Sequence, residues 1–167
     1  MSILLVGADG DVGEAVVARL VQQGDEVRVI ETDERASDRW RALGAHVARG
    51  AADDADLVER AAQNVRTVVV LGEIDVRPVV QGAAAAGVDR LVLTRPAGDA
   101  TDVADCGLDY VVLVVPRTRL VRRRAVAAGA LAEAIDAADD LAGNPKIVVD
   151  LGTDRGRSDL GLDAPSG

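Results

Sequence analysis

Ile3-Leu-Leu-Val-Gly7-Ala-Asp-Gly10-Asp-Val-Gly13 is the stretch of sequence that decides the expected fold. An apolar run of strand character leads into three glycines with the spacing G-x-x-G-x-x-G, and a helical pattern follows over residues 12–23. A second apolar run then ends in the acidic residue Glu31. This succession of strand, glycine turn, helix and acid-tipped strand is typical of the first half of a Rossmann-type dinucleotide-binding fold.

Each glycine of the turn has its own steric role. Gly7 lets the chain leave the strand in a tight turn, Gly10 lets the backbone approach a pyrophosphate, and Gly13 lets the helix pack on the sheet. The amides near Asp11 and Val12 would then point at the phosphates along the positive end of the helix dipole. We therefore predict that this turn binds the diphosphate of a dinucleotide.

The acidic residues near the turn bear on which dinucleotide is bound. We expect Glu31, with Thr32 beside it, to hold the adenosine ribose hydroxyls, and a carboxylate there would repel a 2′-phosphate, so NAD is preferred over NADP. Asp9, Asp11 and Glu14 place three carboxylates where the diphosphate should arrive. The alternative is that these acids cap the helix themselves and leave the anion site partly self-occupied, with low cofactor affinity.

Short β-branched runs alternate with alanine-rich helical patterns along the rest of the chain. This pattern predicts a Rossmann-like, doubly wound α/β fold with a mainly parallel sheet and helices on both faces. The expected strands are residues 2–6, 26–30, 46–48, 67–71, 90–93, 110–115 and 147–150. The expected helices are residues 12–23, 37–43, 55–62, 79–86 and 125–141. Right-handed crossovers predict the strand order 3-2-1-4-5-6, with the seventh strand beside the sixth.

The ligand crevice of such a sheet lies over the carboxyl ends of the first and fourth strands. The predicted cofactor-binding residues are therefore Gly7, Asp9, Gly10, Asp11, Val12, Gly13, Glu31, Thr32, Leu71, Gly72 and Glu73. Thr94 and Arg95 end the fifth strand and are weak catalytic candidates. No metal site is predicted, because His46 has no cysteine or carboxylate cluster at ligand spacing.

Length and composition suit one compact domain. The 167 residues predict a single NAD(P)-binding domain over residues 1–151 and a flexible tail over residues 152–167, which is rich in Gly, Asp and Ser. A net charge of −9 argues against nucleic acid and anionic membranes as partners. The sequence has no apolar run long enough for a membrane span and begins directly with a strand, so we expect a cytoplasmic protein.

Several stretches resemble the atypical short-chain dehydrogenase/reductase superfamily, in its NmrA-like or NAD(P)H-binding branch. The glycine turn over residues 7–13 is similar to the G-x-x-G-x-x-G loop of that family. Residues 44–57, 84–93 and 106–116 resemble its third strand and following turn, the passage into its fifth strand, and its sixth strand. The resemblance implies an NAD(P)-binding Rossmann fold and oxidoreductase-like ancestry.

The chain departs from that family where the chemistry lies. The family usually handles the proton and the carbonyl oxygen with a Tyr and a Lys four residues later, but Val114 holds that place after Tyr110, and Lys146 is the one lysine. We therefore expect an NAD(H)-binding protein without ordinary Tyr/Lys catalysis, in a regulatory or scaffolding role. The alternatives are a small NAD(P)-dependent reductase of an anionic substrate, which would use Thr94 and Arg95, and a vestigial module for protein–protein interaction.

A second resemblance covers the first 70 residues. Residues 29–33, 44–47 and 50–54 are also similar to regulatory nucleotide-binding domains of potassium channels and transporters, which use the dinucleotide as a signal. The spacing between Gly7 and Gly10 and the passage over residues 84–93 favour the first family.

Two further features suggest partners. The segment Arg117–Arg124 carries five arginines after the sixth strand; it is either a solvated loop and helix start or a clamp for an anionic small molecule. The helical patterns over residues 79–86 and 125–141 have apolar faces, which makes a homodimer plausible.

Overall fold

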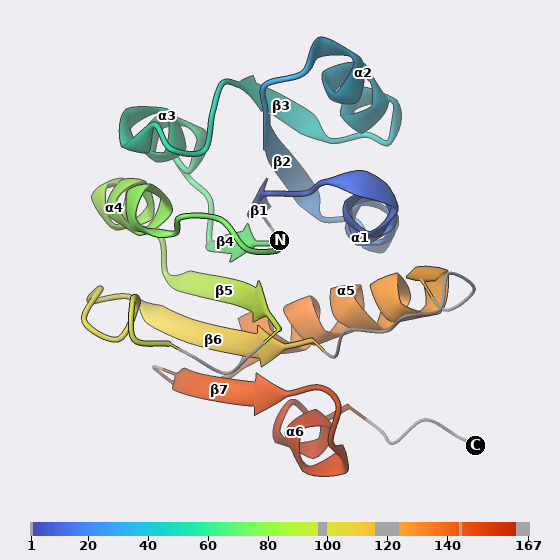
Figure 1. Ribbon diagram of the computed structural model, residues 1–167, viewed down its shortest axis with the longest axis vertical. Helices are drawn as coiled ribbons and strands as arrows, with labels where there is room; N and C mark the ends of the chain where they lie inside the picture. The colour runs from blue at the N-terminus through green and yellow to red at the C-terminus, as the bar shows by residue number, and fades with distance from the viewer. Residues whose placement is uncertain (1, 97–99, 116–123, 144, 163–167) are drawn as a thin grey trace.

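The computed structural model describes residues 2–96, 100–115, 124–143 and 145–162, and these residues form one seven-stranded sheet (Figure 1). The strands are β1 (Ser2–Val6), β2 (Glu26–Glu31), β3 (His46–Arg49), β4 (Thr67–Val70), β5 (Arg90–Arg95), β6 (Asp109–Val114) and β7 (Lys146–Asp150). All neighbouring strands are parallel, and their order is β3-β2-β1-β4-β5-β6-β7. The predicted Rossmann-like α/β fold and its strand order are confirmed.

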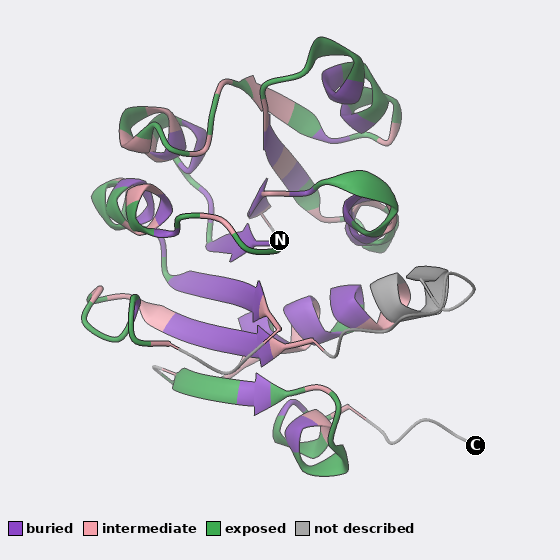
Figure 2. Cartoon of the chain, viewed as in Figure 1, coloured by how far each residue is buried: buried purple, intermediate pink, exposed green. Residues whose placement is uncertain are grey.

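Helices cover both faces of this sheet (Figure 1). The helices are α1 (Gly10–Gln23), α2 (Glu34–Ala42), α3 (Ala55–Ala61), α4 (Arg77–Ala86), α5 (Arg124–Asp140) and α6 (Asp154–Asp159). The core on one face joins strand residues to α1, α2, α5 and the end of α6, and the core on the other face joins them to α3 and α4. Because helices lie on both sides, most strands are continuous runs of buried apolar residues, as Figure 2 shows for β5 and β6.

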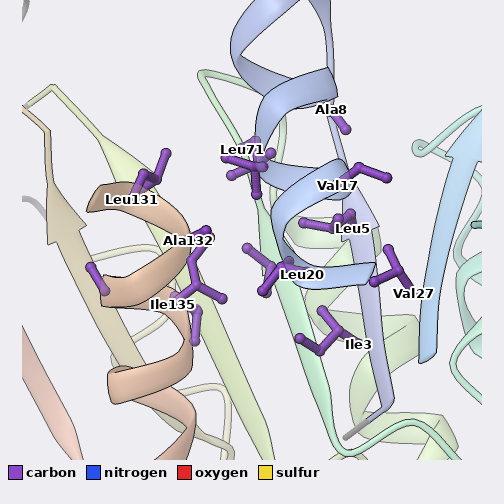
Figure 3. Close-up of a cluster of buried hydrophobic side chains, with 14 of the residues drawn as sticks. Ile3, Leu5, Ala8, Val17, Leu20, Val27, Leu71, Leu131, Ala132 and Ile135 are labelled. Atoms are coloured by element: carbon purple, nitrogen blue, oxygen red, sulfur yellow. The ribbon is translucent and has the colours of Figure 1, made fainter. Parts of the chain in front are cut away.

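Packing between α1 and α5 builds the larger of the two cores. Figure 3 shows Leu131, Ala132 and Ile135 of α5 in one buried cluster with Leu20 of α1 and Leu71 after β4. Leu20 and Ile135 are fully buried. This contact packs α5 alongside α1.

Side-chain caps shift some helix starts from the predicted positions. The Asp33 carboxylate accepts a hydrogen bond of 2.7 Å from the Ala36 amide, so α2 begins at Glu34 rather than at Ser37. Asp54 accepts one of 3.0 Å from the Leu57 amide and starts α3 at the predicted place.

The segment after β7 differs from the predicted flexible tail. Thr153 caps α6 through its hydroxyl, which accepts a hydrogen bond from the Gly156 amide. A Cβ at Gly156 would lie 2.1 Å from the Asp150 carbonyl oxygen, and Leu160 is buried in the core with α5. The chain up to residue 162 is therefore packed on the sheet, because this tertiary contact supports a helix that is too short and too polar to be recognised locally. Residues 163–167 lie outside the described part of the chain.

The apolar faces proposed for a homodimer are used within the chain. Val79 and Ala83 of α4 are fully buried in the core with α3, and Ile135 and Ala138 of α5 are fully buried in the core with α1. The helical spacing identified apolar faces correctly, but both faces pack on the chain's own sheet.

Close packing of α3 on α4 generates a stability prediction. A Cβ at Gly82 would lie 2.6 Å from both the Ala55 carbonyl oxygen and the Val58 Cβ, whereas a Cβ at the helical residue Gly129 would meet no neighbouring atom within 4 Å. Gly82→Ala should therefore lower the free energy of unfolding by about 1–3 kcal/mol, through overpacking. Gly129→Ala is the matched control and should raise it by about 0.5–1 kcal/mol. Urea denaturation measures both, and a Gly82→Ala protein as stable as wild type would contradict the close packing.

Candidate functional site

The glycine turn joins β1 to α1 at the carboxyl edge of the sheet and is fixed at both ends. Gly7 has a φ of +74°, and a Cβ there would lie 2.4 Å from the Leu71 carbonyl oxygen. A Cβ at Gly13 would lie 2.4 Å from the Ala8 carbonyl carbon. Between them, Gly10 has a φ of +64°, and a Cβ there would meet no atom within 4 Å. Two glycines therefore allow close backbone packing, and the third faces open space.

The first turn of α1 lacks the cap that the sequence allows. Asp9 is at the N-cap position with extended backbone, but its side chain makes no capping hydrogen bond. Asp33 and Asp54, at the same position of α2 and α3, do cap their helices. The alternative in which the acids of the turn cap the helix themselves therefore does not hold for Asp9, and its carboxylate leaves the first-turn amides to another acceptor.

A cavity of about 370 Å³ lies beside this turn, over the carboxyl ends of β1, β4, β5 and β6. Its lining residues are Gly7, Asp9, Val12, Gly13, Leu71, Gly72, Glu73, Ile74, Thr94, Arg95, Pro96, Val115 and Leu131. The structure thus brings together most of the predicted turn residues, the predicted residues after β4 and the two catalytic candidates. Sequence reasoning did not single out Ile74, Val115 and Leu131, which form an apolar wall; Leu131 comes from α5, and its contribution depends on tertiary packing.

A second cavity of about 370 Å³ adjoins the first, and the two share the lining residues Gly72, Glu73, Ile74, Arg95 and Pro96. Val70 and Val76 give it apolar walls. The two cavities together provide space for a ligand longer than one ring system.

Thr94 has a structural role at this edge. Its hydroxyl accepts a hydrogen bond of 3.1 Å from the Gly72 amide and donates one of 3.3 Å to the Val70 carbonyl, and the residue is buried. The side chain thereby fixes the turn after β4 to β5. Because both interactions are made to the backbone, Thr94 holds the cavity wall in place.

Two arginines near the cavity are paired with aspartates. Arg95 donates two hydrogen bonds, of 2.8 and 2.7 Å, to the two carboxylate oxygens of Asp102, and its side chain is only 17% exposed. An anionic ligand would have to compete with Asp102 for this guanidinium. Arg77 likewise donates two side-chain hydrogen bonds to Asp75, which hold the pKa of that carboxyl below its ordinary value.

Glu31 is held in one orientation at the end of β2. One carboxylate oxygen accepts a hydrogen bond of 2.9 Å from the Asp33 amide, and the other accepts one of 3.0 Å from the indole N–H of Trp40. Trp40 is only 3% exposed and belongs to the core under α2. Glu31 and Thr32 do not line the cavity beside the glycine turn. No signal in the sequence connects Trp40 to Glu31, because the pairing depends on how α2 is rotated.

The one tyrosine and the one lysine of the chain lie near the amino ends of their strands, whereas the cavity lies at the carboxyl ends. Tyr110 and Lys146 are register partners near the amino ends of β6 and β7. The turn at Gly7 follows the carboxyl end of β1, and all strands run in the same direction. Both residues therefore lie at the ends of their strands that point away from the glycine turn.

Three further predictions concern the arginine segment, metal binding and membrane spans. Residues 116–123 lie outside the described residues, so the structure does not place the arginine segment Arg117–Arg124, apart from the backbone of Arg124 at the start of α5. Among the described residues, no group of three or more His, Cys, Asp or Glu side chains could hold a metal ion. Within the same residues, no helix has the length and apolar character needed to cross a membrane.

The fold and the site define a Rossmann domain with a dinucleotide-type glycine turn at its carboxyl edge. The model of the TrkA-N domain family matches residues 3–93, which is more than half of the chain. The chain therefore belongs to this family of NAD(P)-binding Rossmann domains.

Solved structures with a similar fold include several reductases. An NADPH-dependent quinone oxidoreductase from Escherichia coli has a TM-score of 0.70 at 19% identity, over 97% of this chain and 76% of that one. The anaerobillin reductase ChuY from Escherichia coli O157:H7 has a TM-score of 0.71 at 17% identity, over 90% and 96%. AtPrR2 in its apo form has a TM-score of 0.58 at 24% identity, over 68% and 47%, so the chain spans about half the length of that protein. Among curated proteins, none matches the chain.

The role of Thr94 generates a prediction for the site. Thr94→Val keeps the shape of the buried side chain but removes the acceptor of the Gly72 amide and the donor to the Val70 carbonyl, which should lower the free energy of unfolding by about 0.5–1.5 kcal/mol. Thr32→Val, at an exposed position, is the control and should change it by less than about 0.5 kcal/mol. Urea denaturation of the two variants tests this, and equal effects would mean that the Thr94 hydroxyl does not fix the turn.

Proposed function

We propose that this chain binds NAD(H) at the carboxyl edge of its sheet and acts in a regulatory or scaffolding role, without ordinary Tyr/Lys catalysis. The observation that carries the proposal is the combination of open space at Gly10 with an α1 helix that Asp9 leaves uncapped, directly beside a cavity. Backbone amides at a helix start, with room for a ligand in front of them, are suited to a diphosphate. Membership of the TrkA-N family supports the same ligand class.

The parts of the dinucleotide have distinct places in this proposal. The diphosphate would lie over Gly10 and the first turn of α1, and the adenosine ribose would reach Glu31 at the end of β2. The nicotinamide half would enter the cavity between Val12 and Ile74, whose walls are mainly apolar. Such a wall excludes water from a flat ring while the charged diphosphate stays at the open turn.

The preference for NAD over NADP rests on Glu31. Each of its carboxylate oxygens accepts one hydrogen bond within the protein, which leaves further acceptor sites for the two ribose hydroxyls. A 2′-phosphate at the same place would meet a fixed negative charge. The E. coli quinone oxidoreductase has also been solved with NADPH and AtPrR2 with NADP+, and a preference for the phosphorylated cofactor is the alternative outcome.

Two observations support the proposed regulatory role. Tyr110 and Lys146 lie at the opposite edge, and Thr94 is bonded to the backbone on both sides. The resemblance to regulatory nucleotide-binding domains also falls within the segment that the TrkA-N model matches.

The second candidate is a small NAD(P)-dependent reductase. The adjoining cavity with Val70 and Val76 favours it, because a substrate could lie there next to a nicotinamide. Hydride transfer from the cofactor with a proton from solvent needs no tyrosine. Steady oxidation of NADH in the presence of a carbonyl or quinone substrate, lost when the cavity residue Ile74 is enlarged to Trp, would favour this function over the first.

Thermal unfolding with added dinucleotide tests the proposal directly. NADH at a hundred times its dissociation constant should stabilise the chain by about 2.7 kcal/mol, which corresponds to a rise in Tm of about 5–10 °C, and NADPH should give a smaller shift. Glu31→Ala should reduce the shift with NADH and narrow the difference between the two cofactors. Glu133→Gln on the exposed side of α5 is the control and should leave both shifts unchanged. The absence of a shift with either cofactor would contradict dinucleotide binding and favour a vestigial module that binds other proteins.

Trp40 provides a second test, because its indole N–H orients the Glu31 carboxylate. Trp40→Phe keeps an aromatic ring under α2 but removes this donor, so the affinity for NADH should fall about three- to tenfold, which corresponds to the net contribution of about 1 kcal/mol of a typical hydrogen bond. The ratio of NADH to NADPH affinities should fall as well, which a general loss of stability would not cause. Isothermal titration calorimetry measures both affinities. An unchanged ratio would show that Trp40 serves only the core.

A further inference from the structure

Large apolar side chains are exposed at only two places on the described part of the chain. The large hydrophobic residues that remain exposed there are Val12, Ile147 and Val148, at 38%, 36% and 44%. Val12 lines the cavity of the candidate site. Ile147 and Val148 are neighbours in β7, the last strand of the sheet, and Figure 2 shows that β7 is mostly exposed where β5 and β6 are buried.

The backbone of β7 presents every second residue to its outer edge. The Pro145 carbonyl accepts a hydrogen bond from the Tyr110 amide, and the Leu151 amide donates one to the Val114 carbonyl, so the odd-numbered residues face β6. Lys146, Val148 and Asp150 therefore direct their backbone groups away from the sheet. An edge of this kind, with apolar side chains, is a template for another strand.

We propose that β7 pairs antiparallel with β7 of a second copy of this chain, on a two-fold axis at Val148. In that register Val148 forms a hydrogen-bonded pair with the partner's Val148. The Asp150 carbonyl already accepts from the amide and hydroxyl of Thr153, and the Gly156 backbone of α6 packs against the Asp150 backbone, so the pairing provides two backbone hydrogen bonds across the axis, both at Val148.

Charge complementarity favours a second copy as the occupant. Lys146, Val148 and Asp150 share one face of the strand, so the same register places Lys146 beside the partner's Asp150, and does so twice. Both Val148 side chains then cover each other at the centre. A strand with a cation at one end, an anion at the other and an apolar centre matches its own antiparallel copy.

β3, the edge strand at the other side of the sheet, does not have a comparable exposed apolar surface. β3 carries His46 and Arg49 at its ends, and Arg49 pairs with Glu34 at 3.5 Å. The residues between them, Val47 and Ala48, are half-buried. The pairing surface that we infer is therefore β7 and does not depend on the dinucleotide.

Sedimentation equilibrium of the full chain at high micromolar concentration tests the pairing. Wild type should have twice the mass of one chain. Val148→Lys should have the mass of one chain, because the pairing would place two cations at the axis. Ala85→Lys adds the same charge to an exposed position on α4 and should keep the mass of the pair. A wild-type protein of single-chain mass, or a Val148→Lys protein that still pairs, would overturn the proposal.

Cross-linking tests the register even if Val148→Lys fails to fold. In a Cys106→Ser background, Val148→Cys places two thiols in a hydrogen-bonded pair, where the Cα separation of about 5.5 Å permits a disulfide. Lys146→Cys is the control: the two substituted residues would be about 14 Å apart, at four residues of strand rise, and should not link. A covalent pair from Val148→Cys alone supports the inference. Equal linking of both variants, or of neither, would reject it.

Discussion

The contact between Gly13 and Ala8 is the constraint on which the site depends. The backbone of α1 lies so close to the chain leaving β1 that a Cβ at Gly13 would meet the Ala8 carbonyl carbon at 2.4 Å. This contact fixes where α1 starts and how it lies on the sheet, and Val16, Val17 and Leu20 are buried as a result. The core that they form with α5 then brings Leu131 to the cavity.

The fold could be predicted because its signals are local. Continuous apolar runs identify strands buried on both faces, and the spacing of Gly7, Gly10 and Gly13 identifies the first turn without knowledge of the rest. The helix α6 could not be predicted, since it depends on contacts of Gly156 and Leu160 with elements distant from it in the sequence.

The site could be predicted only in part, for the same reason. The residues that follow β1 and β4 can be read from the sequence, and the structure brings them to one cavity. The interactions of each side chain depend on its orientation, which the sequence does not specify. The pairing of Arg95 with Asp102 and of Trp40 with Glu31 arises from how a loop returns and how a helix is rotated, and no spacing in the sequence encodes either.

Buried polar side chains at the amino ends of the strands hold the end of α5 in place. At the amino edge, the buried Arg90 donates to the carbonyls of Ala138 and Leu141 at the end of α5, and the buried Thr67 hydroxyl donates to the Asp139 carboxylate. The Arg90 bonds satisfy carbonyls at the end of the helix, and together with the Thr67 bond they anchor that end to the sheet. Because the end of α5 is anchored, the position of Leu131 in the cavity wall is fixed as well. A fixed wall suits a site that keeps its shape when a ligand binds.

The inferred pairing of β7 with a second copy leaves the candidate site of each chain unchanged. Asp150 is the register partner of Val114, and the next residue of that strand, Val115, lines the cavity, so the inferred axis lies close to the site along the sheet. An antiparallel axis reverses the strand direction, however, and the carboxyl edges of the two copies then face opposite ways. Each cavity would be built from its own chain alone. A dinucleotide could influence pairing through the β6–β7 contact or through the core that joins Leu131 to Val149. Any such coupling would be equal in both directions, because linkage between two binding equilibria is reciprocal.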